Sequence, residues 1–199
     1  MKLLREYIRQ LLTEAAKAPE DLLAYDDVHV FIRNEGDMAK IFFSYEDGKA
    51  APEPNGSMWI ASKRQPECGN AWEVVAASAP HGWGPLLYDV AMEWATLNGG
   101  GLISDRDTVS QDARGVWDYY MNKRPDVTAH QLDNKRNTLT PEKEDNCEQN
   151  IAGDLGTYSW TDSDEEIDDD SWVSNPLSKR YTAPPKTIRK LKTLKRLIT

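Results

Sequence analysis

The hydrophobic residues of this chain change their spacing near Pro85, and this change limits the possible folds more than any other feature. Before Pro85, short runs alternate apolar and polar residues, as from Val28 to Ile32, which is typical of half-buried β-strands. After Pro85, apolar residues recur three and four positions apart, as expected of amphipathic helices. Strand patterns therefore dominate between residue 28 and Pro85 and helical patterns dominate after it, and the sequence predicts an α+β fold.

Turn residues and helix stops place the individual elements. An amphipathic helix is expected over residues 2–23, and a first hairpin over 28–45 with its turn at Asn34-Glu35-Gly36-Asp37. The remaining elements are a second hairpin, a helix that ends before three glycines, a short strand, a helix that Ser110 caps and Pro125 ends, and a last strand, at residues 58–77, 85–98, 102–104, 110–125 and 127–132.

The formal net charge of −9 hides two segments of opposite sign. Residues 154–170 carry eight acidic residues and no base, whereas residues 171–199 carry eight Lys or Arg and no acid. The body up to residue 153 is therefore acidic by itself. This argues against a broad nucleic-acid-binding face and confines any such role to the basic tail.

Cysteine spacing and hydropathy indicate the expected compartment. Cys68 and Cys147 lie far apart without metal-ligand spacing, so we expect reduced thiols and neither a disulfide nor a metal site. No apolar run approaches the roughly 18 residues that a membrane span needs, and charges interrupt the N-terminal leucines. We therefore expect an intracellular protein that does not contact membranes.

A glycine-rich turn, Gly82-Trp83-Gly84, leads from a predicted strand into the helix that starts at Pro85. Such a turn presents backbone N–H groups and the positive end of a helix to an anion, which is the geometry of a phosphate site. The alternative is a tight strand-to-helix connection that binds no ligand.

The order strand, Gly82-Trp83-Gly84, helix, short strand and aromatic-rich helix resembles the GNAT acyltransferase superfamily over residues 58–132. The resemblance implies a mixed, mostly antiparallel sheet flanked by helices, acetyl-CoA as cofactor, and transfer of the acetyl group to an amine. In that family the pyrophosphate of coenzyme A lies on this turn and pantetheine pairs with the preceding strand. The cofactor-binding residues implied here are Val75, Ala77, Gly82, Trp83 and Gly84.

The same resemblance implies two catalytic residues, Glu73 as a base that acts through water and Tyr120 as a general acid. The family commonly has its tyrosine where this chain has Trp117, which cannot protonate a thiolate. Ala79 also replaces the family's Gln or Arg, and Pro85 removes one N–H at the helix start. The alternatives are a solvated strand carboxylate, a core or rim tyrosine, and a non-catalytic protein that keeps the fold.

The N-terminus carries a second resemblance, to the capsid-targeting peptides of large tailed phages. These begin Met-Lys, form a short amphipathic helix and end in Leu/Ile-x-Glu, as Leu12-Thr13-Glu14 before Ala15 does here. The resemblance implies a phage-encoded protein that resides in the host cytoplasm or the virion interior, with a phage head or host protein as partner. The alternative is a helix packed on the domain.

The domain organisation combines these interpretations. We expect an N-terminal helix that is also a candidate cleaved peptide, a GNAT-like domain, an acidic linker and a basic helix, over residues 1–24, 25–150, 151–183 and 184–199. The tail is expected to be mobile. Its basic helix carries a narrow apolar stripe that suits nucleic acid, a partner groove or the acidic part of the same chain, formed by Ile188, Leu191, Leu194 and Ile198.

Overall fold

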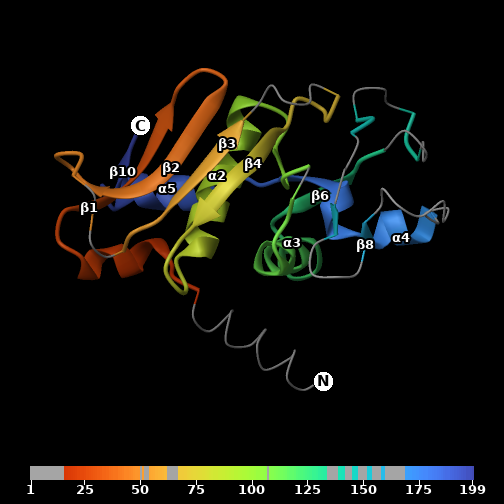
Figure 1. Cartoon of the computed structure of the whole chain (residues 1–199). Helices are drawn as coiled ribbons and strands as arrows, with labels where there is room; N and C mark the ends of the chain where they lie inside the picture. The colour runs from red at the N-terminus through yellow and green to blue at the C-terminus, as the bar shows by residue number, and fades with distance from the viewer. Residues whose placement is uncertain are drawn as a thin grey trace, which may run out of the picture. The chain divides into compact units, whose positions relative to one another are not determined.

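The computed structural model divides the chain into two compact units (Figure 1). The structure describes residues 16–49, 51, 54–61, 67–106, 108–133, 139–141, 145–147, 152–153, 158–159 and 169–199. The first unit comprises Met1–Trp59, Ala76–Ala91 and Pro185–Thr199, and the second comprises Ile60–Val75 and Met92–Pro184. We describe each unit by itself.

The elements form the α+β fold that the sequence predicts. The main sheet has the strand order β10-β1-β2-β3-β4-β5-β9-β6, and β7 pairs with β8 separately. The strands are β1 (Val28–Asn34), β2 (Met38–Tyr45), β3 (Ser57–Ala61), β4 (Trp72–Ser78), β5 (Leu102–Ile103), β6 (Thr128–Gln131), β7 (Ala152–Gly153), β8 (Tyr158–Ser159), β9 (Lys179–Thr182) and β10 (Leu197–Ile198). The helices are η1 (Pro19–Ala24), α2 (Gly84–Asn98), α3 (Gln111–Lys123), α4 (Asp169–Ser174), η2 (Pro176–Ser178) and α5 (Lys186–Thr193).

The predicted first hairpin is confirmed. Strands β1 and β2 pair antiparallel from Val28↔Tyr45 to Asn34↔Ala39. Gly36 lies in the turn with φ +83°, a conformation that glycine adopts without steric cost. Alternate residues of both strands are buried, including Val30 and Ile41 at 0% exposure. The alternation of apolar and polar residues in the sequence therefore corresponds to one packed face and one outer face of this hairpin.

The predicted helices after Pro85 are also confirmed, with the caps that the sequence suggests. Ser110 Oγ accepts a hydrogen bond from the Ala113 amide at 3.2 Å at the start of α3. The glycines after α2 also allow close packing, because a Cβ at Gly101 would overlap the Tyr181 carbonyl. This stop is therefore a packing requirement as well as a helix end.

The C-terminal region departs from the expected acidic linker and mobile tail. Strand β9 is inserted between β5 and β6 and pairs antiparallel with both. Tyr181 in β9 is fully buried, and its hydroxyl donates to the Pro176 carbonyl at 2.6 Å. Residues 179–182 thus belong to the sheet. The sequence pattern did not reveal this strand, because the strand has four residues and lies between highly charged stretches.

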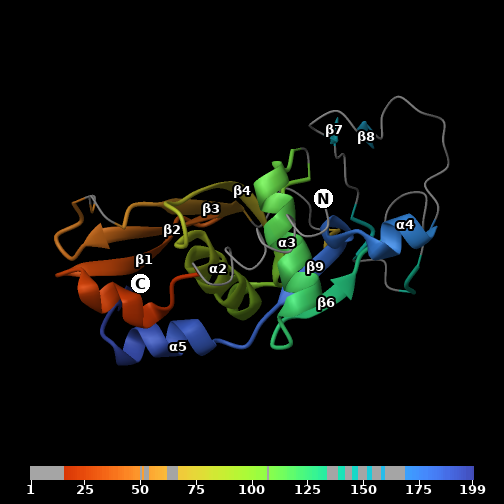
Figure 2. The ribbon, with the colours of Figure 1, turned by 90° about the horizontal axis from the view of Figure 1, so that it is seen from below.

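The basic helix is confirmed, but it is shorter than its apolar stripe suggested. Ile188 and Leu191 of α5 are buried, and Lys190 pairs with Glu20 of η1 at 2.7 Å. Figure 2 shows α5 and η1 on one side of the β1–β2 hairpin. Lys195, at φ +56°, follows the helix, and β10 then pairs parallel with β1. Ile198 therefore contributes to a strand, not to the helix.

The predicted N-terminal helix lies largely outside the described residues, since the structure describes the chain from residue 16. Where the two overlap, Pro19 begins the short helix η1. The Asp21 carboxylate accepts a hydrogen bond from the Ala18 amide at 2.8 Å and so caps this helix. Pro19 lies within the helix expected over residues 2–23, and it starts a separate short turn.

The expectation of reduced thiols is wrong. Cys68 and Cys147 form a disulfide with a Cα–Cα distance of 4.6 Å, although 79 positions separate them. Both cysteines are fully buried in a small cluster with Ala71, Ile103 and Leu132. Sequence spacing could not reveal the bond, because the fold around this cluster brings the two residues together.

We expect the disulfide to contribute about 4 kcal/mol to the free energy of unfolding, since it closes a long loop of the unfolded chain. Urea denaturation with and without dithiothreitol measures this contribution. The Cys68→Ala/Cys147→Ala double variant is the control, and dithiothreitol should not affect it. Equal stability of the wild type in both conditions, with free thiols confirmed by titration, would contradict the expectation.

Leu191→Ala should lower the free energy of unfolding by about 2–5 kcal/mol, because it removes a fully buried side chain from under the sheet. The neighbouring exposed Lys192→Ala is the matched control and should stay within about 0.5 kcal/mol of the wild type. Chemical denaturation monitored by tryptophan fluorescence compares the two. A tail that does not pack on the first unit would make both substitutions silent.

Candidate functional site

The segment from β4 through the glycine turn to α2 has the local geometry that the sequence predicts. Gly82 has φ +84°, so a residue with a side chain would be strained there. Gly84 begins α2, and both glycines are partly exposed. Within β4, Val75 is partly exposed and Ala77 is exposed. Four of the five predicted binding residues in this segment are thus at least partly exposed.

The fifth predicted binding residue, Trp83, lies in the core. Its ring is 4% exposed and makes edge-to-face contacts with Tyr25 and Phe43, at centroid distances of 5.7 and 5.3 Å. Its amide donates to the Pro80 carbonyl at 3.1 Å. Trp83 therefore anchors the turn in the first unit and directs neither its ring nor its amide to a ligand.

The first turn of α2 has two amides without a helical acceptor, of which Gly84 is partly exposed and Leu86 is buried at 2% exposure. The helix itself supplies no acceptor for the Gly84 and Leu86 N–H groups, because the first four amides of a helix lack helical partners. Pro85 lies between them and has no N–H. A Cβ at Gly84 would meet no heavy atom within 4 Å, so the space beside this amide is open among the described residues.

Strands β4 and β5 run parallel but pair only briefly. The register joins Trp72 with Leu102 and Glu73 with Ile103, and β5 ends there. The Trp72 amide also donates to the Gly101 carbonyl at 2.8 Å. Strand β4 continues to Ser78, so its last five residues extend beyond the paired region.

The Glu73 side chain makes the next contact after the backbone pairing of β4 and β5 ends. Its Oε1 accepts a hydrogen bond from the Arg106 amide at 3.0 Å, and the residue is 2% exposed. The carboxylate is therefore neither the solvated strand residue nor an exposed base. A general base must reach the proton that it removes, and these contacts direct Glu73 towards the protein interior.

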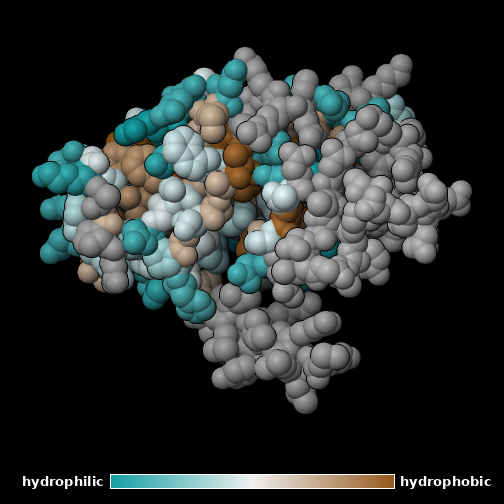
Figure 3. All heavy atoms as spheres, in the orientation of Figure 1, coloured by the Kyte–Doolittle hydropathy of each residue, from teal (hydrophilic) through white to brown (hydrophobic). Residues whose placement is uncertain are grey.

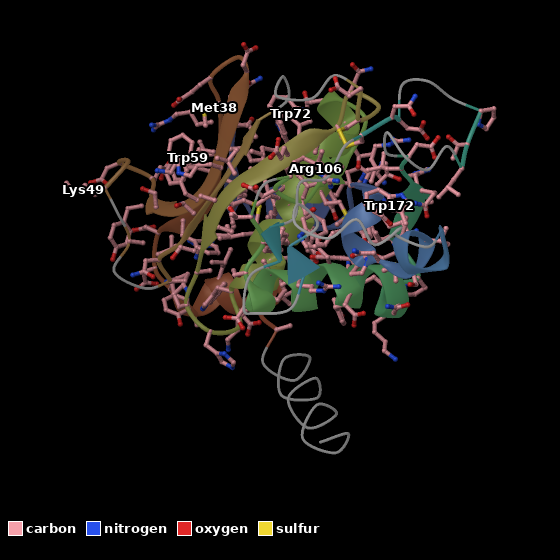
Figure 4. The ribbon with its side chains drawn as sticks, turned by 45° about the vertical axis from the view of Figure 1, so that its right-hand side comes forward. Met38, Lys49, Trp59, Trp72, Arg106 and Trp172 are labelled. Carbon is pink, nitrogen blue, oxygen red and sulfur yellow. A yellow bond between two sulfur atoms is a disulfide. The ribbon has the colours of Figure 1, made fainter. Side chains whose placement is uncertain are left out.

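Arg106, labelled in Figure 4, is fully buried beside Glu73. Its Nε donates to the Ser104 carbonyl, and its Nη2 donates to Ser104 Oγ at 3.1 Å and to the Leu177 carbonyl at 3.0 Å. Burial lowers the pKa of the guanidinium to about 10, against the opposite effect of the Glu73 and Asp105 carboxylates. Arg106 thus connects the end of β5 to η2.

Tyr120 lies in an aromatic core of the second unit. It is 1% exposed, and the guanidinium of Arg124 lies 5.3 Å from its ring centroid. Trp117, also 1% exposed, stacks on Tyr181 at a centroid distance of 5.1 Å. These contacts support the core interpretation of Tyr120, because a general acid needs access to the leaving group.

From the sequence, the run Asp105-Arg106-Asp107 could bind a polar acceptor or pair internally, and in the structure Arg106 makes internal hydrogen bonds. In Asp105-Arg106-Asp107 the arginine resembles an exposed loop residue between two acids. No local pattern signals its burial, because Ser104, Glu73 and Leu177 come together only in the folded sheet. His81 beside the glycine turn is exposed, as expected of a loop histidine.

We expect Glu73→Gln to lower the free energy of unfolding by about 3–5 kcal/mol, because the buried Arg106 guanidinium loses a nearby negative charge. Urea denaturation measures the change. Glu46→Gln makes the same chemical change at an exposed position and should stay within about 0.5 kcal/mol. If both variants unfold at the wild-type urea concentration, the Glu73 carboxylate does not support the fold.

Comparisons with protein family models, curated proteins and solved structures find no match to this chain. Among the described residues, none of the helices has the length and apolar character required to cross a membrane. Functional conclusions therefore depend on the residues and contacts described above.

Proposed function

We propose that this protein binds acetyl-CoA along β4 and the glycine turn, and transfers the acetyl group to an amine. One observation carries the proposal: β4 separates from its parallel neighbour β5 after two residue pairs and then leads directly to Gly82 and α2. The strand order on that side, with β9 between β5 and β6, is compatible with the mixed sheet that the GNAT resemblance implies.

Backbone groups of β4 would hold the pantetheine arm. Beyond Glu73 the strand has no β5 partner, so an edge is left that an extended ligand can pair with. Val75 and Ala77 lie in this stretch, and the Gly84 amide would then receive the pyrophosphate at the helix start. The positive end of α2 favours that negative charge.

Transfer would depend mainly on positioning. The amine nitrogen attacks the thioester carbonyl, the C–S bond breaks, coenzyme A leaves as the thiolate, and the ammonium proton passes to solvent or to that thiolate. Holding the two reactants together supplies much of the rate enhancement in such reactions. The burial of Glu73 and Tyr120 favours this route over one in which they transfer protons.

A second candidate is a non-catalytic protein of a phage particle, or one that binds a host protein. The burial of Tyr120 and Trp117, the tie between Glu73 and Arg106, and the missing N–H of Pro85 favour it. The residues that resemble a capsid-targeting peptide, 1–14, lie outside the described part of the chain, so packaging in a phage head remains a proposal. This candidate predicts no acetyl-CoA binding.

Isothermal titration with acetyl-CoA tests the proposal, and Gly84→Asp should weaken binding at least tenfold. The added carboxylate would repel the pyrophosphate, while the open space beside Gly84 and the preference of helix starts for acidic residues should preserve folding. Gly84→Asn is the matched control without charge and should bind more tightly than Gly84→Asp.

Two outcomes would contradict the acyl-CoA site. No heat with millimolar acetyl-CoA and the folded wild type would favour the non-catalytic candidate. Equal affinity of the wild type and Gly84→Asp would place the ligand away from the glycine turn.

A further inference from the structure

The first unit has a sheet face that the described helices do not cover. Figure 2 places α5 and η1 on one side of the β1–β2 hairpin, and Figure 3 looks onto the other side. Three aromatic residues of this outer face, one from each of β1, β2 and β3, are partly exposed: Phe31, Phe42 and Trp59. Together with Arg33 and Lys40, we call them the aromatic platform.

The side chains of the platform contact one another across the strands. Phe31 stacks on Phe42 at a centroid distance of 5.2 Å with 18° between the ring planes. Lys40 Nζ lies 5.0 Å from the Phe42 centroid and 4.6 Å from the Trp59 centroid. The Arg33 guanidinium lies 5.3 Å from the Phe42 centroid. The platform is thus a continuous cluster of rings and cations.

The pleat of the strands explains why these residues share one face. Alternate residues of a strand point to opposite faces, so the buried Val30, Ile32 and Ile41 place their neighbours in sequence on the outside. Trp59, labelled in Figure 4 with Met38, lies between the buried Met58 and Ile60 of β3. Met38 extends the same face and is 36% exposed.

The charge of the platform is opposite to that of the whole chain. The residues of β1 and β2 on this face that are at least partly exposed are Phe31, Arg33, Met38, Lys40 and Phe42, which include no carboxylate, whereas His29 and Ser44 on the same face are buried. The acidic residues nearby, such as Glu35 and Glu46, lie in turns at the ends of the strands. On a chain of net charge −9, this face offers an anion two cations that already lie against aromatic rings.

We propose that the aromatic platform binds single-stranded nucleic acid. Unpaired bases would stack on the rings of Phe31, Phe42 and Trp59, while Arg33 and Lys40 would contact phosphates. Exposed rings beside cations favour unpaired bases, because a duplex keeps its bases stacked inside and an acidic peptide needs no aromatic surface. The site is distinct from β4 and the glycine turn, so it does not depend on acetyl-CoA binding.

Fluorescence anisotropy with a labelled oligothymidylate of about 15 nucleotides tests the proposal, because this length covers the known site sizes of sheet-based binders. Trp59→Leu and Phe42→Leu keep apolar bulk but remove a ring, and each should weaken binding at least fivefold. Trp59→Phe keeps a ring and should retain most of the affinity. Thermal unfolding should show that all three variants are folded.

The salt dependence provides a second readout. Two phosphate contacts predict a slope of about −1.4 in log affinity against log salt for a single strand. Lys40→Gln should bring this slope closer to zero by about 0.7. Lys192→Gln makes the same change on the exposed side of α5 and should leave both slope and affinity unchanged.

Four outcomes would overturn the proposal. In the first, the folded wild type shows no binding at low salt. In the second, the Lys192→Gln variant loses binding while the ring variants bind normally, which would assign the nucleic-acid site to α5. Equal affinity for a duplex of the same length, unaffected by the ring variants, would show phosphate contact without stacking. Binding of polyglutamate, but not of the oligonucleotide, would identify an acidic protein partner instead.

Discussion

The hydrogen bond between Glu73 and Arg106 links β4 to the segment after β5, at the point in the second unit where the backbone pairing of these strands ends. Strands β4 and β5 share only two residue pairs, and the next contact is the Glu73 side chain with the Arg106 amide. The Arg106 guanidinium in turn donates to the Ser104 and Leu177 carbonyls, so Arg106 connects β4 through its amide, and the end of β5 and η2 through its side chain. A buried charge is costly to desolvate and is kept only where charge and hydrogen bonds offset that cost. Strand β9 follows η2 directly, so the hydrogen bond from Arg106 to Leu177 lies just before β9 in the chain.

The contact between Glu73 and Arg106 also affects the proposed chemistry. A carboxylate that supports the fold from inside is not available to remove a proton from a substrate, and Tyr120 is enclosed by Trp117 and neighbouring aromatic side chains. An acyltransferase built this way would work by orienting its reactants, for which the open backbone of β4 and the start of α2 are sufficient. The structural roles of Glu73 and Tyr120 equally suit a protein that has the sheet without the reaction. Ligand binding at Gly84, rather than the identity of a catalytic residue, therefore distinguishes the two.

The disulfide and the aromatic platform show how much of the surface and core depends on long-range contacts. Cys68 and Cys147 are 79 residues apart and form a disulfide inside a small buried apolar cluster. The disulfide therefore adds a covalent link to the second unit. In the first unit, three strands each contribute one ring to a cationic face. Net charge is a property of composition, whereas the charge of a face depends on which residues the pleat turns outward. An acidic chain can therefore carry a local site for anions.

The sequence by itself determined the order and type of most elements from Val28 to Gln131, because each signal was local: alternation in β1 and β2, helical spacing after Pro85, the Ser110 cap and the glycine turn. It also located Gly82 just before α2 and Gly84 at its first residue, and Gly82 has the positive φ that favours glycine. Only the tertiary structure decided the burial of Glu73, Arg106 and Tyr120, the Cys68–Cys147 disulfide, and the places of β9 and β10 in the sheet. Each of these depends on residues tens of positions away, and burial and pairing energies arise only when the fold brings such residues into contact.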